Sequence, residues 1–258
     1  GAIHGVMNSH NITPSCETID YGPCPFMDAY DPGTVFSSID SQGRYAYGNQ
    51  PGIAQWNLAR LAETLLPLLH DDADTAVALA TEVINDFTWH YQHHWQAELR
   101  RKLGLAGEQP DDKRLTQDWL DLLQVQRVDF TLAFRQLAEY ARTGAGDTLR
   151  ALFAEAEPLD AWLVRWQMRS AAGQIVEPAA RAEAMCLANP LYIPRNHLVE
   201  AALSAAVEQG DQAPFERLLS VLQRPFDARD GLQDYAVPAP AEAMAGYRTF
   251  CGTLEEVR

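Results

Sequence analysis

The stretch IHGVMNSHN (residues 3–11), followed closely by TIDYG (residues 18–22), carries the strongest pattern in this sequence. The first stretch ends at Asn11, and the second contains Asp20. The residues between them include a Pro-Ser pair (residues 14–15), which favours a turn between two β-prone ends. We therefore predict a tight β-hairpin that brings the side chains of Asn11 and Asp20 together.

Amide and carboxylate oxygens that converge from two backbone segments are suited to a divalent metal ion. A nucleoside triphosphate needs such an ion to neutralise its charge. Kinase-like sites hold that ion with an Asn from the loop after His-Arg-Asp or His-Gly-Asp and an Asp at the end of a neighbouring strand. Asn11 and Asp20 match these two positions. We predict that both bind Mg²⁺ or Mn²⁺ and that Asp20 also contributes to binding ATP.

One position departs from a kinase site. Kinases carry their catalytic Asp two residues after the loop His, whereas this chain has Val6 two residues after His4. A valine side chain can neither accept a proton nor orient a hydroxyl group. The stretch is therefore not that of an ordinary kinase.

The chain resembles the selenoprotein O family of kinase-like protein adenylyltransferases, also called AMPylators. The first block of the resemblance, HGVMN (residues 4–8), is specific, and the resemblance extends over almost the whole chain. The other blocks that carry it are TIDYGP (residues 18–23), FMDAYDP (residues 26–32), GRY (residues 43–45), NQP (residues 49–51), WNLARL (residues 56–61), RNH (residues 195–197) and FCGT (residues 250–253).

The resemblance implies a reaction and the residues that perform it. The family motif runs His-Gly-Val-Met-Asn-Thr-Asp-Asn, in which the Asp accepts a proton and the last Asn binds metal. In this chain His10 stands at the position of the Asp, while Asn11 and Asp20 keep the metal positions. The implied reaction transfers AMP from ATP to Ser, Thr or Tyr hydroxyl groups of proteins, with Mg²⁺ or Mn²⁺ as the metal ion. A neutral imidazole can accept a proton but carries no fixed negative charge.

The resemblance also bears on the cysteines. Members of the family can carry selenocysteine or cysteine near the C-terminus, with a redox link back to the activation-loop region. Cys251 matches that terminal position, and Cys24 follows the TIDYG stretch. A regulatory disulfide between them is one hypothesis. The alternative is that they are free thiols in a reducing compartment, because the four cysteines include no Cys-x-x-Cys pair and no zinc spacing.

Downstream of the opening stretch, apolar residues recur at helical spacing. From residue 53 onward one stripe consists of Ala54, Leu58, Leu61, Leu65 and Leu68. We predict a mainly α chain, the C-lobe of a protein-kinase-like fold with a short β-hairpin at the metal site, plus a C-terminal helical region.

Three segments follow from this prediction. Residues 1–52 would contain the catalytic loop, the metal-site hairpin and an activation-type loop. Residues 53–225 would form the helical C-lobe and a helical extension, and residues 226–258 an extended C-terminal tail rich in Pro and Asp.

Composition argues against several classes of partner. The formal net charge of −15 argues against a surface for nucleic acid or anionic membrane, since either would need clustered Lys and Arg. No apolar run approaches the length of a membrane span, and the chain does not open on a signal peptide, so we expect a cytoplasmic, bacterial protein.

A catalytic loop cannot begin a kinase-like fold, whose N-terminal lobe holds adenine. We therefore expect a C-terminal fragment.

Two other functions remain open at this point. The first is a kinase-like phosphotransferase acting on a protein or a small molecule, because His-Gly and Ile-Asp pairs also occur in aminoglycoside-kinase-like sites. The second is a non-catalytic pseudoenzyme or helical interaction module, which Val6, His10 and the expected absence of the N-terminal lobe favour.

A second cluster of histidines lies in WHYQHHW (residues 89–95). On a helix, Asp86, His90, His94 and Glu98 fall at i, i+4 steps and could gather metal ligands along one ridge. No second helix is marked as completing a coordination shell, so we expect packed, hydrogen-bonded core histidines instead.

Overall fold

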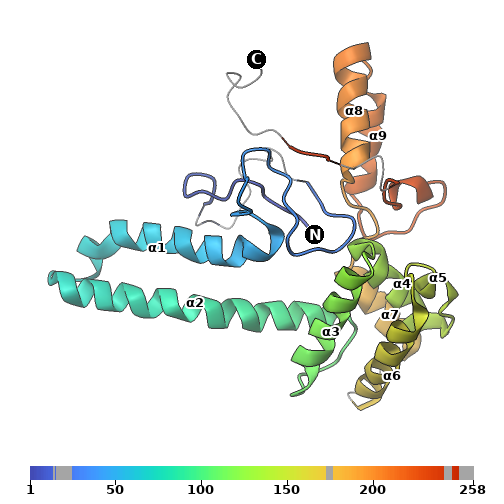
Figure 1. Ribbon diagram of the computed structural model, residues 1–258, viewed down its shortest axis with the longest axis horizontal. Coiled ribbons are helices and arrows are strands. Elements are labelled where there is room, and N and C mark those ends of the chain that lie inside the picture. Colours follow the sequence, from blue (N-terminus) through green and yellow to red (C-terminus); the bar gives the residue numbers. More distant parts are fainter. Residues whose placement is uncertain (14, 16–24, 173–176, 241–245, 250–258) are drawn as a thin grey trace. The chain divides into compact units, whose positions relative to one another are not determined.

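The computed structural model describes residues 1–13, 15, 25–172, 177–240 and 246–249 as helices joined by loops (Figure 1). The helices are α1 (Gln50–Leu69), α2 (Ala73–Lys102), α3 (Asp112–Val125), α4 (Phe130–Thr143), α5 (Asp147–Arg150), α6 (Ala156–Ala172), α7 (Pro178–Ala188), α8 (Asn196–Gln209) and α9 (Ala213–Leu222), with 3-10 turns η1 (Tyr47–Asn49) and η2 (Gln233–Tyr235). The prediction of a mainly α chain is therefore confirmed.

The predicted kinase-like C-lobe with a β-hairpin at the metal site is wrong. In the described part of the chain there are helices and isolated bridges, such as Ala29 with Asp129, but no β-strand. The chain bends back on itself instead, because the Asn11 amide N–H donates to the Asn8 carbonyl oxygen at 3.1 Å. A backbone committed to a turn cannot begin an extended ladder. Residues 16–24 lie outside the described residues.

The chain divides into two compact units, which we describe separately. The first unit comprises Gly1, Phe26–Asp31 and Gln96–Gly246, and the second comprises Ala2–Pro25, Pro32–Trp95 and Tyr247–Arg258. The division into segments 1–52, 53–225 and 226–258 stays a prediction.

Tryptophans fill the core of the first unit. The indoles of Trp119 and Trp162 lie 4.5 Å apart between ring centroids, and both are almost fully buried. Because a buried indole N–H needs an acceptor, the ring nitrogens of Trp162 and Trp166 donate to the carbonyls of Leu115 and Leu103, each at 2.9 Å. These bonds fix α6 against α3 and the end of α2.

A buried ionic network holds residues 26–31 within the same unit. The Arg195 side chain is 0% exposed and pairs with Asp28, with Asp129 at 2.6 Å, and with the Ala236 carbonyl at 2.6 Å. Burial raises the pKa of the Asp129 carboxyl, and the Arg195 guanidinium opposes this rise. The neighbouring Asn196 amide pairs with both backbone polar groups of Phe26, at 3.1 and 2.9 Å. The segment that follows the TIDYG stretch is thereby fixed.

In the second unit, α1 and the part of α2 up to Trp95 run side by side (Figure 1). The Gln55 side-chain amide of α1 donates to the Ile84 carbonyl of α2 at 2.9 Å. Helix α2 begins where the Asp72 carboxylate accepts the Thr75 N–H at 2.9 Å, an N-terminal cap. Neither α1, α2 nor any other described helix is long and apolar enough to cross a membrane.

Removing the cation from the buried network should destabilise the protein strongly. In Arg195→Met, the Asp28 and Asp129 carboxylates would lose their shared counter-charge inside the protein. We expect the free energy of unfolding, measured by urea denaturation, to fall by about 3–5 kcal/mol. The control is Arg224→Met, which breaks the exposed pair with Asp227 and should change stability by less than about 1 kcal/mol. Equal losses for the two variants would contradict this account.

Candidate functional site

The opening loop, defined here as residues 2–13, carries two of the residues that the sequence predicts to act in chemistry. It lies in the second unit and contains no helix. Ile3 anchors its start, since this side chain is 0% exposed and its N–H donates to the Pro25 carbonyl at 2.9 Å. Gly5 has a φ of 81°, a left-handed conformation that glycine adopts without strain.

Two carboxamide side chains of α1 hold the opening loop. The Gln50 oxygen accepts the His4 N–H at 3.0 Å, and its nitrogen donates to the Ala2 carbonyl at 3.2 Å. The Asn57 nitrogen donates to the Met7 carbonyl at 2.9 Å. Because Gln50 and Asn57 are seven residues apart, they lie on one face of the helix, two turns from each other. The loop is therefore fixed at both ends of its His-Gly-Val-Met segment.

Asn11 lies in the turn that follows. Its side-chain nitrogen donates to the Val6 carbonyl at 3.0 Å, and its backbone N–H donates to the Asn8 carbonyl. Because this contact occupies the amide nitrogen, the atom that Asn11 can offer to a cation is the side-chain oxygen. The metal-binding role of Asn11 stays a prediction.

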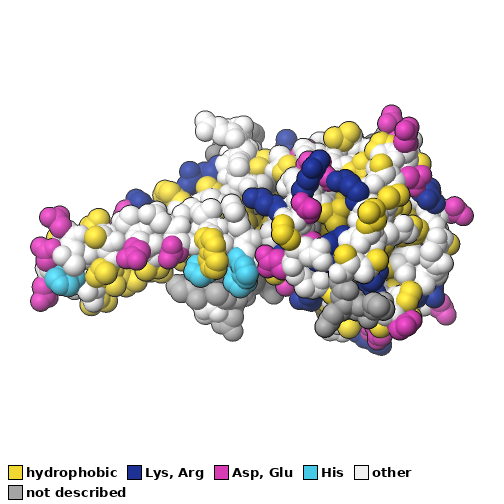
Figure 2. Space-filling model, turned by 90° about the horizontal axis from the view of Figure 1, so that it is seen from below, with side chains coloured by type: hydrophobic (Ala, Val, Ile, Leu, Met, Phe, Trp, Pro, Cys, Tyr) yellow, Lys and Arg dark blue, Asp and Glu magenta, His cyan; other side chains and the backbone are white. Residues whose placement is uncertain are grey.

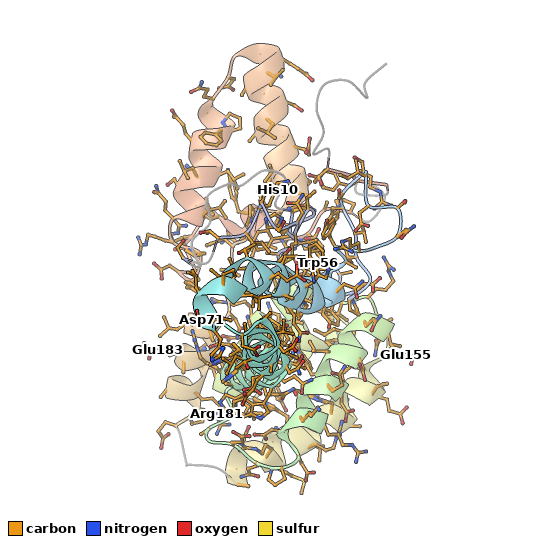
Figure 3. All side chains as sticks on the ribbon, turned by 90° about the vertical axis from the view of Figure 1, so that its left-hand side faces the viewer. His10, Trp56, Asp71, Glu155, Arg181 and Glu183 are labelled. Atoms are coloured by element: carbon orange, nitrogen blue, oxygen red, sulfur yellow. The ribbon has the colours of Figure 1, made fainter. Side chains whose placement is uncertain are left out.

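His10 immediately precedes Asn11 and is exposed (Figure 3). Its backbone is part of the same turn, which precedes Asn11 directly. An exposed imidazole can be reached by a hydroxyl group of another protein. The His10 imidazole is therefore accessible to solvent.

Asp20, the second predicted metal ligand, lies outside the described residues. Its approach to Asn11 stays a prediction. Cys24 and Cys251 also lie outside the described residues, so the disulfide between them remains a hypothesis. Cys186 is described and is a free cysteine.

The side chains available near Asn11 fit a hard cation. The described residues contain no group of three or more His, Cys, Asp or Glu that could hold a metal ion. The opening loop offers amide oxygens instead: the Asn8 side-chain oxygen is buried and has no hydrogen-bond partner within the described chain. Oxygen ligands suit Mg²⁺ and Mn²⁺, whereas soft or imidazole sites favour other metals. The Asn8 and Asn11 amide oxygens are thus of the kind that Mg²⁺ or Mn²⁺ binds, and the addition of the Asp20 carboxylate stays a prediction.

The histidines of α2 form neither a metal ridge nor a core. His90, His93 and His94 are exposed, and the described residues around them provide no group of metal ligands. Instead, the Trp89 indole stacks on the His93 ring with centroids 5.4 Å apart. Figure 2 shows histidines beside hydrophobic side chains on the molecular surface. Our expectation of core histidines was wrong because this face of α2 is not covered by described residues.

Sequence reasoning assigned no role to Gln50 and Asn57. Both belong to blocks of the family resemblance, and we expected the first helix to begin only at residue 53. The available signal was a pair of carboxamide residues two helical turns apart. It did not reveal that their partners are backbone groups of the opening loop.

Comparison with known proteins places these residues in a family. A family model described as "Protein adenylyltransferase SelO" matches residues 1–223. This match includes the whole opening loop and α1 with its two carboxamides. It also includes the charged residues of the buried network, Asp28, Asp129 and Arg195.

Curated relatives named "Protein nucleotidyltransferase YdiU" align along nearly the full chain. The relative from Chromobacterium violaceum is 58% identical over 254 residues, which are 98% of this chain and 53% of the relative. Relatives from Cereibacter sphaeroides (strain KD131) and Mycobacterium sp. (strain KMS) are 56% and 54% identical, over 98% of this chain and 50% of each relative. The chain spans about half the length of the curated relatives it matches. It belongs to the SelO/YdiU family of protein nucleotidyltransferases.

Proposed function

We propose that this chain forms the metal-binding and proton-accepting part of a protein adenylyltransferase. The complete enzyme would transfer AMP from ATP to Ser, Thr or Tyr hydroxyl groups of proteins. Membership of the SelO/YdiU family supports nucleotidyl transfer as the reaction class. The formal net charge of −15 agrees with a protein substrate and argues against a nucleic acid as the acceptor.

The observation that carries this proposal is the arrangement of two neighbouring residues in the opening loop. Asn11 donates its amide nitrogen to the Val6 carbonyl, which leaves the amide oxygen as its ligand atom. His10, directly beside it, is exposed. A metal-bound phosphate group and an incoming hydroxyl group would thus meet at one turn of the backbone.

The chemistry follows from these positions. Asn11 and Asp20 would hold Mg²⁺ or Mn²⁺, which when bound would neutralise charge on the phosphates. The substrate hydroxyl oxygen attacks the α-phosphorus and forms a new P–O bond. The bond from the α-phosphorus to the bridging oxygen breaks, and pyrophosphate leaves. The His10 imidazole accepts the hydroxyl proton during the attack, as a general base.

Isotopic labels on ATP distinguish AMP transfer from phosphate transfer. The test protein is this chain joined to the part of the Chromobacterium violaceum relative that lies outside the match, here called the joined protein. Label from the α-phosphate should enter a protein substrate, while label from the γ-phosphate should not. Incorporation of γ-label instead would show a phosphotransferase and overturn this proposal.

The role of His10 is tested in the joined protein by substitution. His10→Ala should lower kcat for AMP transfer by about 10²- to 10⁴-fold, the usual contribution of a general base. His10→Asp should retain activity, because a carboxylate can also accept the proton.

The matched control for this test is His93→Ala, which removes another exposed imidazole from the same unit and should leave kcat unchanged. Activity in His10→Asp combined with none in the wild-type joined protein would identify His10 as an inactivating replacement.

A further inference from the structure

The polar side chain of Asn57 lies in an unusual place. Helix α1 is described throughout, and Asn57, at 7% exposure, is its one buried residue. Apolar neighbours on the same helix, such as Leu58 and Leu61, are 37% exposed. Burying a carboxamide while leaving leucines exposed costs free energy unless the amide makes a specific contact. The position of Asn57 therefore needs an explanation beyond packing.

The contact that Asn57 makes is with the backbone of the opening loop. Its nitrogen donates to the Met7 carbonyl at 2.9 Å. Met7 is three residues before His10 and four before Asn11, and Val6, the residue before it, accepts the bond from the Asn11 side chain. Any shift of the peptide groups at residues 6 and 7 would therefore be passed directly to Asn11.

The other end of the same side chain argues against a role in stability alone. The Asn57 side-chain oxygen is buried and has no hydrogen-bond partner in the part of the chain that the structure describes. An unmet buried acceptor is destabilising, and an apolar residue of similar size would avoid this cost. Leucine at this position would remove the unmet acceptor but would also leave the Met7 carbonyl without this donor. The asparagine is explained by the bond to Met7.

The geometry points to Asn57 as a positioning residue for AMP transfer. It fixes the Met7 carbonyl and thereby sets where Asn11 and His10 stand relative to the reacting phosphate and hydroxyl groups. This role rests on the proposed function. Gln50, two helical turns away, fixes the other end of the segment through His4. Group transfer is sensitive to displacements of about 1 Å, so losing one of two anchors should reduce turnover more than substrate binding.

Helix α1 provides a matched control in Gln55. Its side-chain nitrogen also donates to a backbone carbonyl at 2.9 Å, but the acceptor is Ile84 of α2 and not the opening loop. Gln55→Leu and Asn57→Leu therefore remove the same kind of hydrogen bond from the same helix. Asn57→Asp gives a third variant, which keeps the shape of the side chain and lacks the N–H donor.

The kinetic test uses the joined protein and measures AMP transfer. Asn57→Leu and Asn57→Asp should lower kcat about 10- to 100-fold, with the KM for ATP within about twofold of wild type. Gln55→Leu should retain both values within about twofold. A kcat for Asn57→Leu equal to that of an active wild-type protein would overturn the inference, as would equal losses for Asn57→Leu and Gln55→Leu.

Hydrogen exchange tests the anchor without relying on activity. In this chain alone, Asn57→Leu should speed exchange of the Asn11 amide, which donates to Asn8, at least tenfold. Gln55→Leu should not. Unchanged exchange in Asn57→Leu would overturn the inference. If the wild-type joined protein transfers no AMP, the proposed function fails, and this exchange measurement still decides whether Asn57 positions the opening loop.

Discussion

A loop without secondary structure must find partners for its backbone polar groups elsewhere, and here α1 supplies them. The carboxamides of Gln50 and Asn57 bond to the opening loop at Ala2, His4 and Met7. Such bonds contribute modestly to stability, about 1 kcal/mol each, but they are directional. They determine which way the Val6 carbonyl faces, and with it the orientation of the Asn11 side chain. The candidate site thus depends on contacts between the side chains of α1 and the backbone of the opening loop.

In the first unit, charged side chains fix a loop segment in the same way. Residues 26–31, which follow the stretch containing Asp20, are held by Arg195 through Asp28 and by Asn196 through the backbone of Phe26. Burying Arg195 with the Asp28 and Asp129 carboxylates costs desolvation free energy. Once formed, the buried group tolerates little rearrangement. In each unit, side chains of a distant helix, or of the residue that precedes it, therefore fix a segment. That segment lies next to predicted ligand residues in the sequence.

The sequence predicted the helical class and the family, because these depend on local pattern and motif. The roles of His10, Asn11 and Asp20 stay predictions. The sequence did not predict the anchors. Apolar periodicity in α1 indicates a buried stripe, yet Leu58 and Leu61 are partly exposed and Asn57 is buried. Periodicity also suggested core histidines on α2, where His90 and His94 are exposed. The predicted β-hairpin was wrong, because the described residues around Asn11 form a turn between Asn8 and Asn11 and no β-strand. Burial depends on tertiary partners, which a local pattern does not contain.

We propose that the turn of the opening loop binds the metal ion that accompanies ATP. Paramagnetic broadening of backbone amide signals by Mn²⁺ with ATP, measured by NMR in the joined protein, tests it most directly. If the ion binds at this turn, broadening should be strong and selective at residues 8–11 and weak at His90 to His94 of α2. Broadening centred on the α2 histidines, with the Asn11 signal unaffected, would contradict it.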